Sequence, residues 1–583
     1  MPKNFLKMSK KQQPIQQVQT PVAPSVPKIW ESKPFLLALL SNFVLFGLIY
    51  TFFTSHFQEN DDVGMLLEAA GELIASEPTA YLLFTNILIG GILKSLYSIF
   101  PQTAWYGLYL VFVLFVTHIG IFYVLLKRLA SVWAIILYLL YFFVAATHPL
   151  TSMQFTTVAA LASTAGLAVL IFIDEKNWKI WIGGIFLVFL GSLVRFQSFI
   201  LSFAMFAPVF LYFLIVDFKQ LFQKILPLGL SLALVILGFF IQKTAYQQAD
   251  WAMFEKTSPL IGEFVDNQAL SKGTPEAQQK ALAKANWTMV DYAMMGNWFF
   301  VDKDLYSFER ASAALSELGI ENRELKTDQI WEYQQKEIFA RPAVTRTLIL
   351  TLFFSLFFAF AKFEWISIGV SVLMMPFVLG IIHFILKQPP MHVYHPMFMH
   401  LALLPLFFLD KQKLLSFKEN GAWIQKISIG ILGLVLMTVF FEVIGELNTF
   451  SKQSKENRRN LRALVASMNP DANNLYVVWA NSFPYELITP FENIDFVKNL
   501  NVFTLGSIQR TPIADKVLEK NQIQNIYTAI AEKPNVYLVV RADYLQRWVG
   551  LYAEFMKQHY QKQITARQVS QNGNMVVLDI GVQ

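Results

Sequence analysis

The stretch PFLLALLSNFVLFGLIYTFF, residues 34–53, is followed two residues later by the polar segment HFQENDD, residues 56–62. The first segment carries no charged residue and is long enough to cross the hydrocarbon core of a membrane as a helix. The second segment is acidic, so it belongs in water beyond the end of that helix. Together they predict a helical membrane protein with an acidic loop at one membrane surface.

The composition of the whole chain agrees with this prediction. Of its 583 residues 55% are apolar and 15% are charged, whereas an average soluble domain has about 25% charged residues. The long continuous apolar runs argue against a β-barrel, whose strands alternate in short segments. The chain has no cysteine, which excludes disulfides, a thiolate metal site and a cysteine nucleophile. We therefore expect a polytopic α-helical membrane protein.

The arrangement of the spans follows from the basic loops. If the apolar segment 81–100 spanned the membrane, Lys127 and Arg128 would lie outside, against the tendency of Lys and Arg to stay in the cytoplasm. Asn86, Gly90 and Lys94 interrupt this segment, so we predict that it lies along the outer interface or dips into the membrane and out again. The N-terminus is then cytoplasmic and the C-terminus extracytoplasmic, in a bacterial inner membrane, because polytopic outer-membrane proteins are barrels. About eleven spans are expected, near residues 34–53, 105–126, 131–147, 154–173, 180–194, 198–216, 225–241, 344–361, 364–386, 397–409 and 427–445.

Three parts with different compositions follow along the chain. Residues 1–30 are rich in Lys, Gln and Pro and predict a disordered cytoplasmic tail. Residues 31–449 form the predicted transmembrane domain, with large outer loops at 55–103 and 244–342. Residues 450–583 predict an extracytoplasmic α/β domain, with short β-branched strands at 475–480, 535–540 and 574–580 and an amphipathic helix at 542–560.

The acidic loop carries two adjacent carboxylates, Asp61 and Asp62. Such a pair suits either a general base, which deprotonates a hydroxyl group, or a divalent cation such as Mg²⁺ or Mn²⁺. An ordinary solvated acidic loop is the alternative interpretation.

Several cationic residues are candidates for binding a phosphate group. Arg195 lies at the outer end of an apolar span, where an arginine is costly and usually functional, although a snorkelling side chain would also explain it. The segment KQPPMHVYHP, residues 387–396, is expected to form a short outer loop that presents Lys387, His392 and His395. Lys94 is a weaker candidate in the interfacial segment. An ordinary polar turn is the alternative for residues 387–396.

The chain resembles the GT-C superfamily of membrane glycosyltransferases in the order of its parts. These parts are an acidic outer motif after the first span, an interfacial segment, a helical body and an outer C-terminal domain. The segment FTNILIGGILKSLYSIFPQTAWYGLYL, residues 84–110, resembles the stretch that follows the acidic motif in bacterial members. The resemblance implies a sugar donor on a polyprenyl phosphate or pyrophosphate, a catalytic carboxylate at Asp61 or Asp62, and donor-phosphate contacts from Arg195 and the 387–396 loop. This loop carries histidines where many members have an Arg-Tyr pair. The chain also lacks the WWD-type signature of oligosaccharyltransferases.

The predicted function is transfer of a sugar from a polyprenyl-phosphate-linked donor to an extracytoplasmic glycan, lipid or protein, with inversion at the anomeric carbon. A transporter or flippase of lipid-linked glycans is the main alternative, and it would place charges within the spans of two related halves. A polysaccharide polymerase or ligase would show basic outer loops instead of an early acidic pair. A non-catalytic scaffold would not need so many spans.

Overall fold

The computed structural model describes most of the chain, namely residues 33–173, 177–318, 327–338, 340–360, 365–386, 388–409, 422–468, 473–498 and 500–583. The predicted tail at residues 1–30 and the candidate Lys387 lie outside these described residues.

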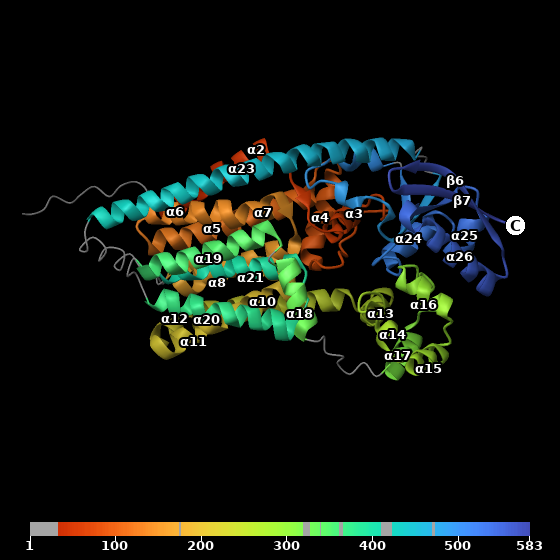
Figure 1. Cartoon of the computed structure of the whole chain (residues 1–583), viewed down its shortest axis with the longest axis horizontal. Coiled ribbons are helices and arrows are strands. Elements are labelled where there is room, and N and C mark those ends of the chain that lie inside the picture. The colour runs from red at the N-terminus through yellow and green to blue at the C-terminus, as the bar shows by residue number, and fades with distance from the viewer. Residues whose placement is uncertain are drawn as a thin grey trace, which may run out of the picture.

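A bundle of apolar helices forms the larger half of the molecule (Figure 1). Within the described residues, seven helical stretches are long and apolar enough to cross a membrane. They are α2 Pro34–Phe52, α5 Trp105–Arg128, Ser131–Thr151 (α6 Ser131–Tyr141, the π-helical turn η1 Phe142–Ala146 and α7 Thr147–Thr151), α8 Phe155–Phe172, Phe196–Val216 (α10 Phe196–Met205 and α11 Ala207–Val216), α12 Phe218–Ala245 and the apolar part of α23 Ala422–Ser467. The predicted polytopic helical fold is confirmed.

Other apolar helices complete the bundle. They are α9 Trp178–Val194, α19 Pro342–Phe360, α20 Trp365–Gly380 with its π-helical continuation η3 Ile381–Leu386, and α21 Met391–Phe408. Helix α8 is buried along its whole length and packs against α5, α9 and α21, so it forms the centre of the bundle.

The interfacial segment folds as α4, Ile87–Ile99, which is too short to span. Its 13 residues extend about 20 Å, whereas the hydrocarbon core is about 30 Å thick. The Asn86 side chain caps α4 by accepting a hydrogen bond from the Leu88 backbone nitrogen, 3.0 Å away. The same side chain donates to the backbone oxygen of Gly238 at 3.0 Å, which fixes the start of α4 against α12.

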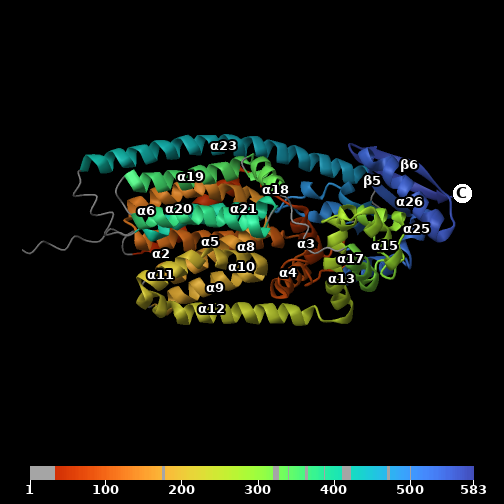
Figure 2. The ribbon, with the colours of Figure 1, turned by 60° about the horizontal axis from the view of Figure 1, so that its bottom comes forward.

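The three polar parts gather at one end of the bundle, as the sequence predicts (Figures 1 and 2). The first part contains the short helix α3, Asn60–Ala70, and strand β1, His56–Phe57, which pairs in parallel with β2, Ser152–Met153. The long loop between α12 and α19 is helical throughout much of its length. Its helices are α13 Ala249–Val265, α14 Ala269–Lys272, α15 Pro275–Ala285, α16 Met289–Gly296, α17 Phe308–Leu318 and α18 Thr327–Tyr333, followed by η2 Gln334–Ile338.

The C-terminal part contains a five-stranded sheet in the order β4-β3-β5-β7-β6. Strands β3, β4 and β5 are parallel, and β7 runs antiparallel to β5 and β6. The bounds are β3 Leu475–Trp479, β4 Asn501–Leu505, β5 Val536–Arg541, β6 Ile564–Asn572 and β7 Met575–Val582, with helices α24 Pro512–Lys520, α25 Ile526–Glu532 and α26 Leu545–Tyr560. The sequence predicted β3, β5, β7 and α26 but missed β4 and β6.

Alternate residues of β3 pack into two different cores. Leu475, Val477 and Trp479 belong to an apolar core shared with the helices of the long loop. Tyr476 and Val478 belong to the core that continues into the helical bundle. Because side chains alternate along a strand, the sheet has two buried faces. The C-terminal part therefore shares its core with the long loop.

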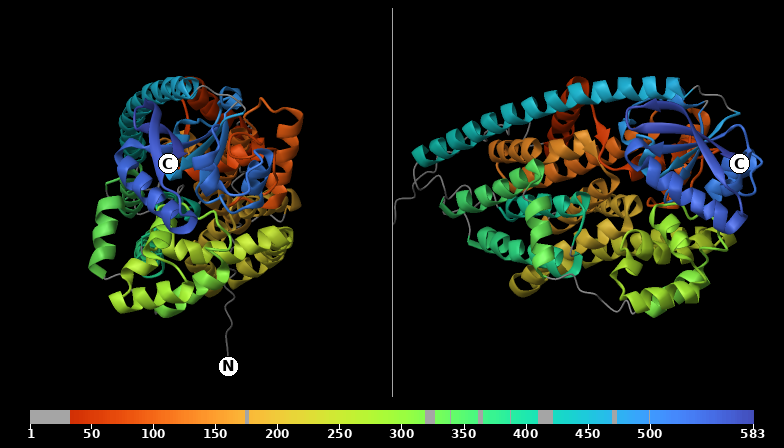
Figure 3. Two further views of the ribbon diagram at one scale, coloured as in Figure 1. Left: turned by 90° about the vertical axis from the view of Figure 1, so that its right-hand side faces the viewer. Right: turned by 45° about the vertical axis from the view of Figure 1, so that its right-hand side comes forward.

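Helix α23 joins the bundle to the sheet without interruption (Figure 3). Its 46 residues extend about 70 Å, and the predicted domain boundary at residues 449–450 falls within this helix. The end of the bundle and the C-terminal part are thus connected by one rigid element.

Candidate active site

Asp61 lies in the first turn of α3, a position that favours a negative charge because backbone N–H groups at a helix start are unpaired. Its side chain is exposed to two adjoining lobes of a cavity at the end of the bundle. Both lobes also share Phe84, Trp298 and Ser507. Each of the three polar parts therefore contributes a wall of this cavity.

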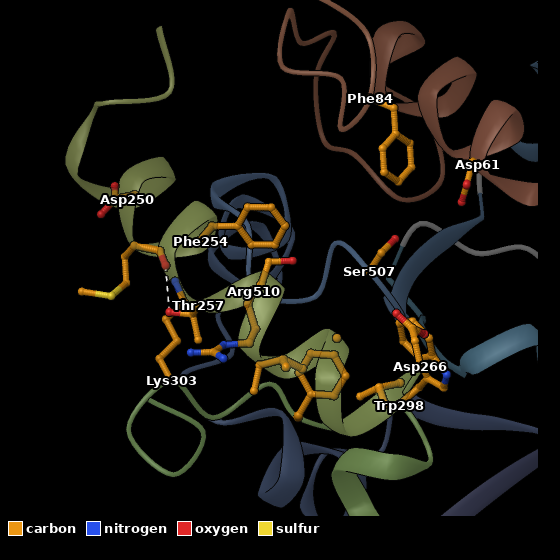
Figure 4. A pocket seen from close by; sticks show the side chains of 16 residues that line it. Asp61, Phe84, Asp250, Phe254, Thr257, Asp266, Trp298, Lys303, Ser507 and Arg510 are labelled. Carbon is orange, nitrogen blue, oxygen red and sulfur yellow. Dashed lines mark hydrogen bonds between the residues drawn. The ribbon is translucent and has the colours of Figure 1, made fainter. Parts of the chain in front are cut away.

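The smaller lobe has a volume of about 460 Å³ and is shown in Figure 4. Asp61 and Phe84 lie on one side, and the long loop supplies Asp266 and Lys303. Arg510, from the C-terminal part, is largely buried and donates a 2.7 Å hydrogen bond to the backbone oxygen of Tyr306. The larger lobe, about 600 Å³, extends from α3 across to the C-terminal sheet. These volumes fall in the range of ligand sites in proteins.

Arg195 supplies a positive charge next to Asp61. Its guanidinium carbon lies 5.0 Å from the centre of the Phe84 ring and 4.9 Å from that of Phe155, two rings that stack on each other. Cation–π contacts of this kind hold an arginine in place without neutralising its charge. Within the described residues the guanidinium makes no hydrogen bond or ion pair, so its donors are available to a ligand.

His392 also reaches this site, but it does so from a helix instead of the predicted loop. Helix α21 begins at Met391, directly after Pro390, so the expected loop 387–396 is largely its first turns. The Nδ1 atom of His392 lies 3.5 Å from Oε1 of Glu59. Arg195 and His392 are therefore close enough to Asp61 for their charges to act on its carboxylate.

The surroundings make the Asp61 carboxylate more basic. The Asp61 carboxylate lies inside the cavity, where the loss of hydration raises its pKa above the ordinary value, and the positive charge of Arg195, together with that of His392 when protonated, opposes this rise. The negative charges of Glu59 and Asp266 raise the pKa further. A carboxylate with a raised pKa accepts a proton more readily, which is the property a general base needs.

Asp62 points away from the cavity, because successive residues of a helix face different directions. It is fully buried, and its Oδ1 accepts hydrogen bonds from the Tyr106 hydroxyl at 3.0 Å and the Phe155 backbone nitrogen at 3.2 Å. Burial raises the pKa of Asp62 well above its ordinary value, although these two hydrogen bonds oppose the rise. The geometry therefore gives Asp62 a structural position, in place of the expected contact with substrate or metal.

The acidic residues do not form a metal site in this arrangement. No group of three or more His, Asp or Glu side chains is placed to hold a metal ion anywhere in the described part of the chain. The buried Asp62 and the exposed Asp61 do not converge on a common point. Asp61 and Asp62 therefore do not fit as joint ligands of the Mg²⁺ or Mn²⁺ ion considered from the sequence.

Two other predicted phosphate ligands lie elsewhere. Lys94 lines a separate cavity of about 270 Å³ together with Tyr81, Trp251 and Lys516. His395 is buried inside the bundle, where its ring meets the edge of His148 at 5.0 Å. The structure therefore corrects the prediction that Lys94 and His395 bind the donor phosphate near Asp61, because Lys94 lines a separate cavity and His395 is buried in the bundle.

Sequence reasoning missed several residues of the cavity. Glu68 lies two turns after Asp61 on the same face of α3 and lines the larger lobe. Burial raises the pKa of Glu68 to about 8. Glu68 follows Asp61 by seven residues, a spacing that places two side chains on one face of a helix. The sequence could have indicated Glu68 only if α3 had been predicted as a helix. Trp298 and Arg547 come from distant parts of the chain, and no local pattern marks them.

Comparisons with known proteins give little further guidance. No family model and no curated protein matches the chain. Among solved structures, the chain is similar to ArnT from Cupriavidus metallidurans bound to undecaprenyl phosphate, with 10% identity, a TM-score of 0.38 and coverage of 94% of this chain and 98% of that chain. The apo state of that ArnT gives 9% identity, a TM-score of 0.41 and the same coverage. At these values neither likeness assigns an activity to the chain.

Proposed function

We propose that the protein is a membrane glycosyltransferase that moves a sugar from a polyprenyl-phosphate-linked donor to a hydroxyl group of an extracytoplasmic acceptor. The observation that carries the proposal is the position of the Asp61 carboxylate. It opens into the cavity near Arg195, a cation that makes no ion pair or hydrogen bond within the described residues, at the place where the apolar bundle meets the polar parts of the chain.

A lipid-linked sugar donor needs these two environments at once. Its polyprenyl chain requires an apolar surface, which the lipid-facing sides of the helices offer. Its phosphate requires cations at the end of that surface, and Arg195 and His392 fit this role, because a guanidinium makes strong charge-assisted hydrogen bonds to phosphate oxygens. Its sugar then extends into the cavity toward Asp61.

The proposed reaction is a single displacement at the anomeric carbon. The acceptor oxygen forms a bond to this carbon while the bond between the carbon and the phosphate oxygen breaks. Asp61 takes the proton of the acceptor hydroxyl, and the electron pair of the broken bond leaves with the polyprenyl phosphate. Arg195 stabilises the negative charge that develops on the leaving phosphate. One base and one displacement invert the anomeric configuration.

The substitution Asp61→Asn tests this assignment, because asparagine keeps the shape of the side chain but cannot accept the proton. We expect transfer from a radiolabelled polyprenyl-phosphate sugar by the purified full-length protein to fall by about 10²-fold to 10⁴-fold. Asp304→Asn is the matched control, because Asp304 is exposed and lies outside both lobes.

Near-normal transfer by the Asp61→Asn variant would refute the role of Asp61. The wild-type protein in proteoliposomes also separates the proposal from the transporter alternative. Movement of a lipid-linked glycan across the bilayer without sugar transfer would overturn the transferase assignment.

A further inference from the structure

The larger lobe continues from Asp61 to the C-terminal sheet, and its far end is rich in aromatic and arginine side chains. Those that come from the C-terminal part are Tyr485, Arg541, Tyr544, Arg547 and Trp548. We propose that the larger lobe binds the acceptor, and that the acceptor is an oligosaccharide with an acidic group. This inference rests on the proposed function for its placement of the reaction at Asp61.

Trp298 is held in a strained conformation at the junction of the two lobes. Its φ angle of 65° lies in the left-handed region, which is unusual for a bulky residue. The neighbouring Phe299 is fully buried and stacks on Tyr527, and Gln509 donates a 3.1 Å hydrogen bond to the Trp298 backbone oxygen. Strain that is maintained in this way is typical of functional sites. The left-handed conformation of Trp298 places its indole ring at the wall of the cavity.

A second aromatic surface lies across the lobe. Tyr544 is 37% exposed and stacks on Trp548 with ring centres 4.9 Å apart, and Trp548 stacks in turn on the buried Trp479. The Trp548 indole nitrogen donates a 3.0 Å hydrogen bond to Asn297, next to Trp298. The two surfaces are therefore fixed relative to each other. Aromatic faces, which are negative at the ring centre, suit the positively polarised C–H groups of a sugar ring.

The charges of the lobe are separated along its length. The acidic side chains of Glu59 and Asp61 lie at the α3 end, and Arg541 and Arg547 lie at the opposite end. Arg541 is paired with Asp543, whereas Arg547 is exposed and makes no ion pair or hydrogen bond among the described residues. An acceptor with a hydroxyl group at one end and an acidic group at the other would match this polarity. Its hydroxyl would then face Asp61.

Arg547 and the aromatic surface belong to one helix face. Tyr544 precedes α26, and Arg547 and Trp548 follow it at spacings of three and four residues, which places them next to each other at the helix surface. The guanidinium carbon of Arg541 lies 5.2 Å from the centre of the Tyr544 ring, so a sugar would pack against the exposed edge of this ring and bring its carboxylate or phosphate group to Arg547. This arrangement gives a specific role to a cation that has no structural partner in the described part of the chain.

Binding to the full-length protein in detergent tests the inference. The probes are an oligogalacturonate and an uncharged malto-oligosaccharide of the same length, measured by isothermal titration calorimetry. We expect the oligogalacturonate to bind about tenfold more tightly than the malto-oligosaccharide, and Arg547→Gln to remove this preference. We expect Tyr544→Ala to weaken binding of both probes about tenfold. Arg567→Gln is the control, because Arg567 is exposed on the distant strand β6 and paired with Asp579.

The outcomes separate this inference from the proposed function. Asp61→Asn should bind both probes normally while it loses transfer, because Asp61 acts on the reacting hydroxyl. Equal affinity for the two probes, no binding of either, or an equal effect of Arg547→Gln and Arg567→Gln would overturn the acidic-acceptor inference. Binding that follows the expected pattern in a wild-type protein without transfer activity would retain the inference and overturn the proposed function.

Discussion

At the scale of single residues, the loss of hydration and the charge of Arg195 shift the pKa of Asp61 in opposite directions. The base must be deprotonated, so activity should fall as the pH is lowered through the pKa of Asp61, which the loss of hydration places above the ordinary value. Arg195 opposes this rise, so Arg195→Gln should raise the pKa and move the acid limb of the kcat/KM profile to higher pH. Arg195→Lys keeps the positive charge and should leave the limb near its original position. If the acid limb of the Arg195→Gln profile lay at the same pH as that of the wild type, the charge of Arg195 would have no effect on the pKa of Asp61.

Glu68 provides a stability prediction at the same scale. Its pKa of about 8 in the folded protein exceeds its ordinary value of 4.5, so the folded state binds more protons between these values. Stability from this group is fully present below about pH 4.5 and is lost as the pH rises through about 8. Glu68→Gln cannot ionise, so its Tm should fall less than that of the wild type between pH 6 and 9 in scanning fluorimetry. Glu519→Gln, an exposed control, should retain the wild-type slope, and an unchanged slope in Glu68→Gln would contradict the buried position of this carboxyl.

At the scale of elements, hydropathy predicts a bundle of apolar helices, because long apolar runs have few alternatives in a membrane, and seven helical stretches of the described residues are long and apolar enough to cross it. The sequence predicts a loop where the structure has the short helix α3. This difference determines where the side chains of the two aspartates lie. In a loop, Asp61 and Asp62 are equivalent, but in a helix they point in different directions, so one is exposed and one is buried. The prolines before His392 similarly suggested a loop where α21 begins. Strand β6 was missed because its sequence ITARQVSQN has little apolar alternation, as suits an exposed edge.

At the scale of the whole molecule, the cavity depends on how the C-terminal part sits on the bundle. Asp61, Trp298 and Ser507 are far apart in the sequence, so no local pattern could predict that they share one cavity. The contact between the two parts is close at Gly107, near the start of α5. A methyl group at Gly107 would lie 2.0 Å from the backbone oxygen of Pro490, so either helix α5 or the 490 segment would have to move.

We therefore expect Gly107→Ala to lower the stability of the protein by about 1–3 kcal/mol, the usual cost of overpacking. It should also increase hydrogen–deuterium exchange near residue 490 and weaken the binding of both oligosaccharide probes, because the walls of the larger lobe would separate. Gly91→Ala is the matched control, since a methyl group there meets no atom within 4 Å and alanine favours the helix. Equal Tm, exchange and binding in the two variants would mean that the contact at Gly107 does not hold the C-terminal part in place, and that the cavity is maintained by the polar contacts between the long loop and the sheet.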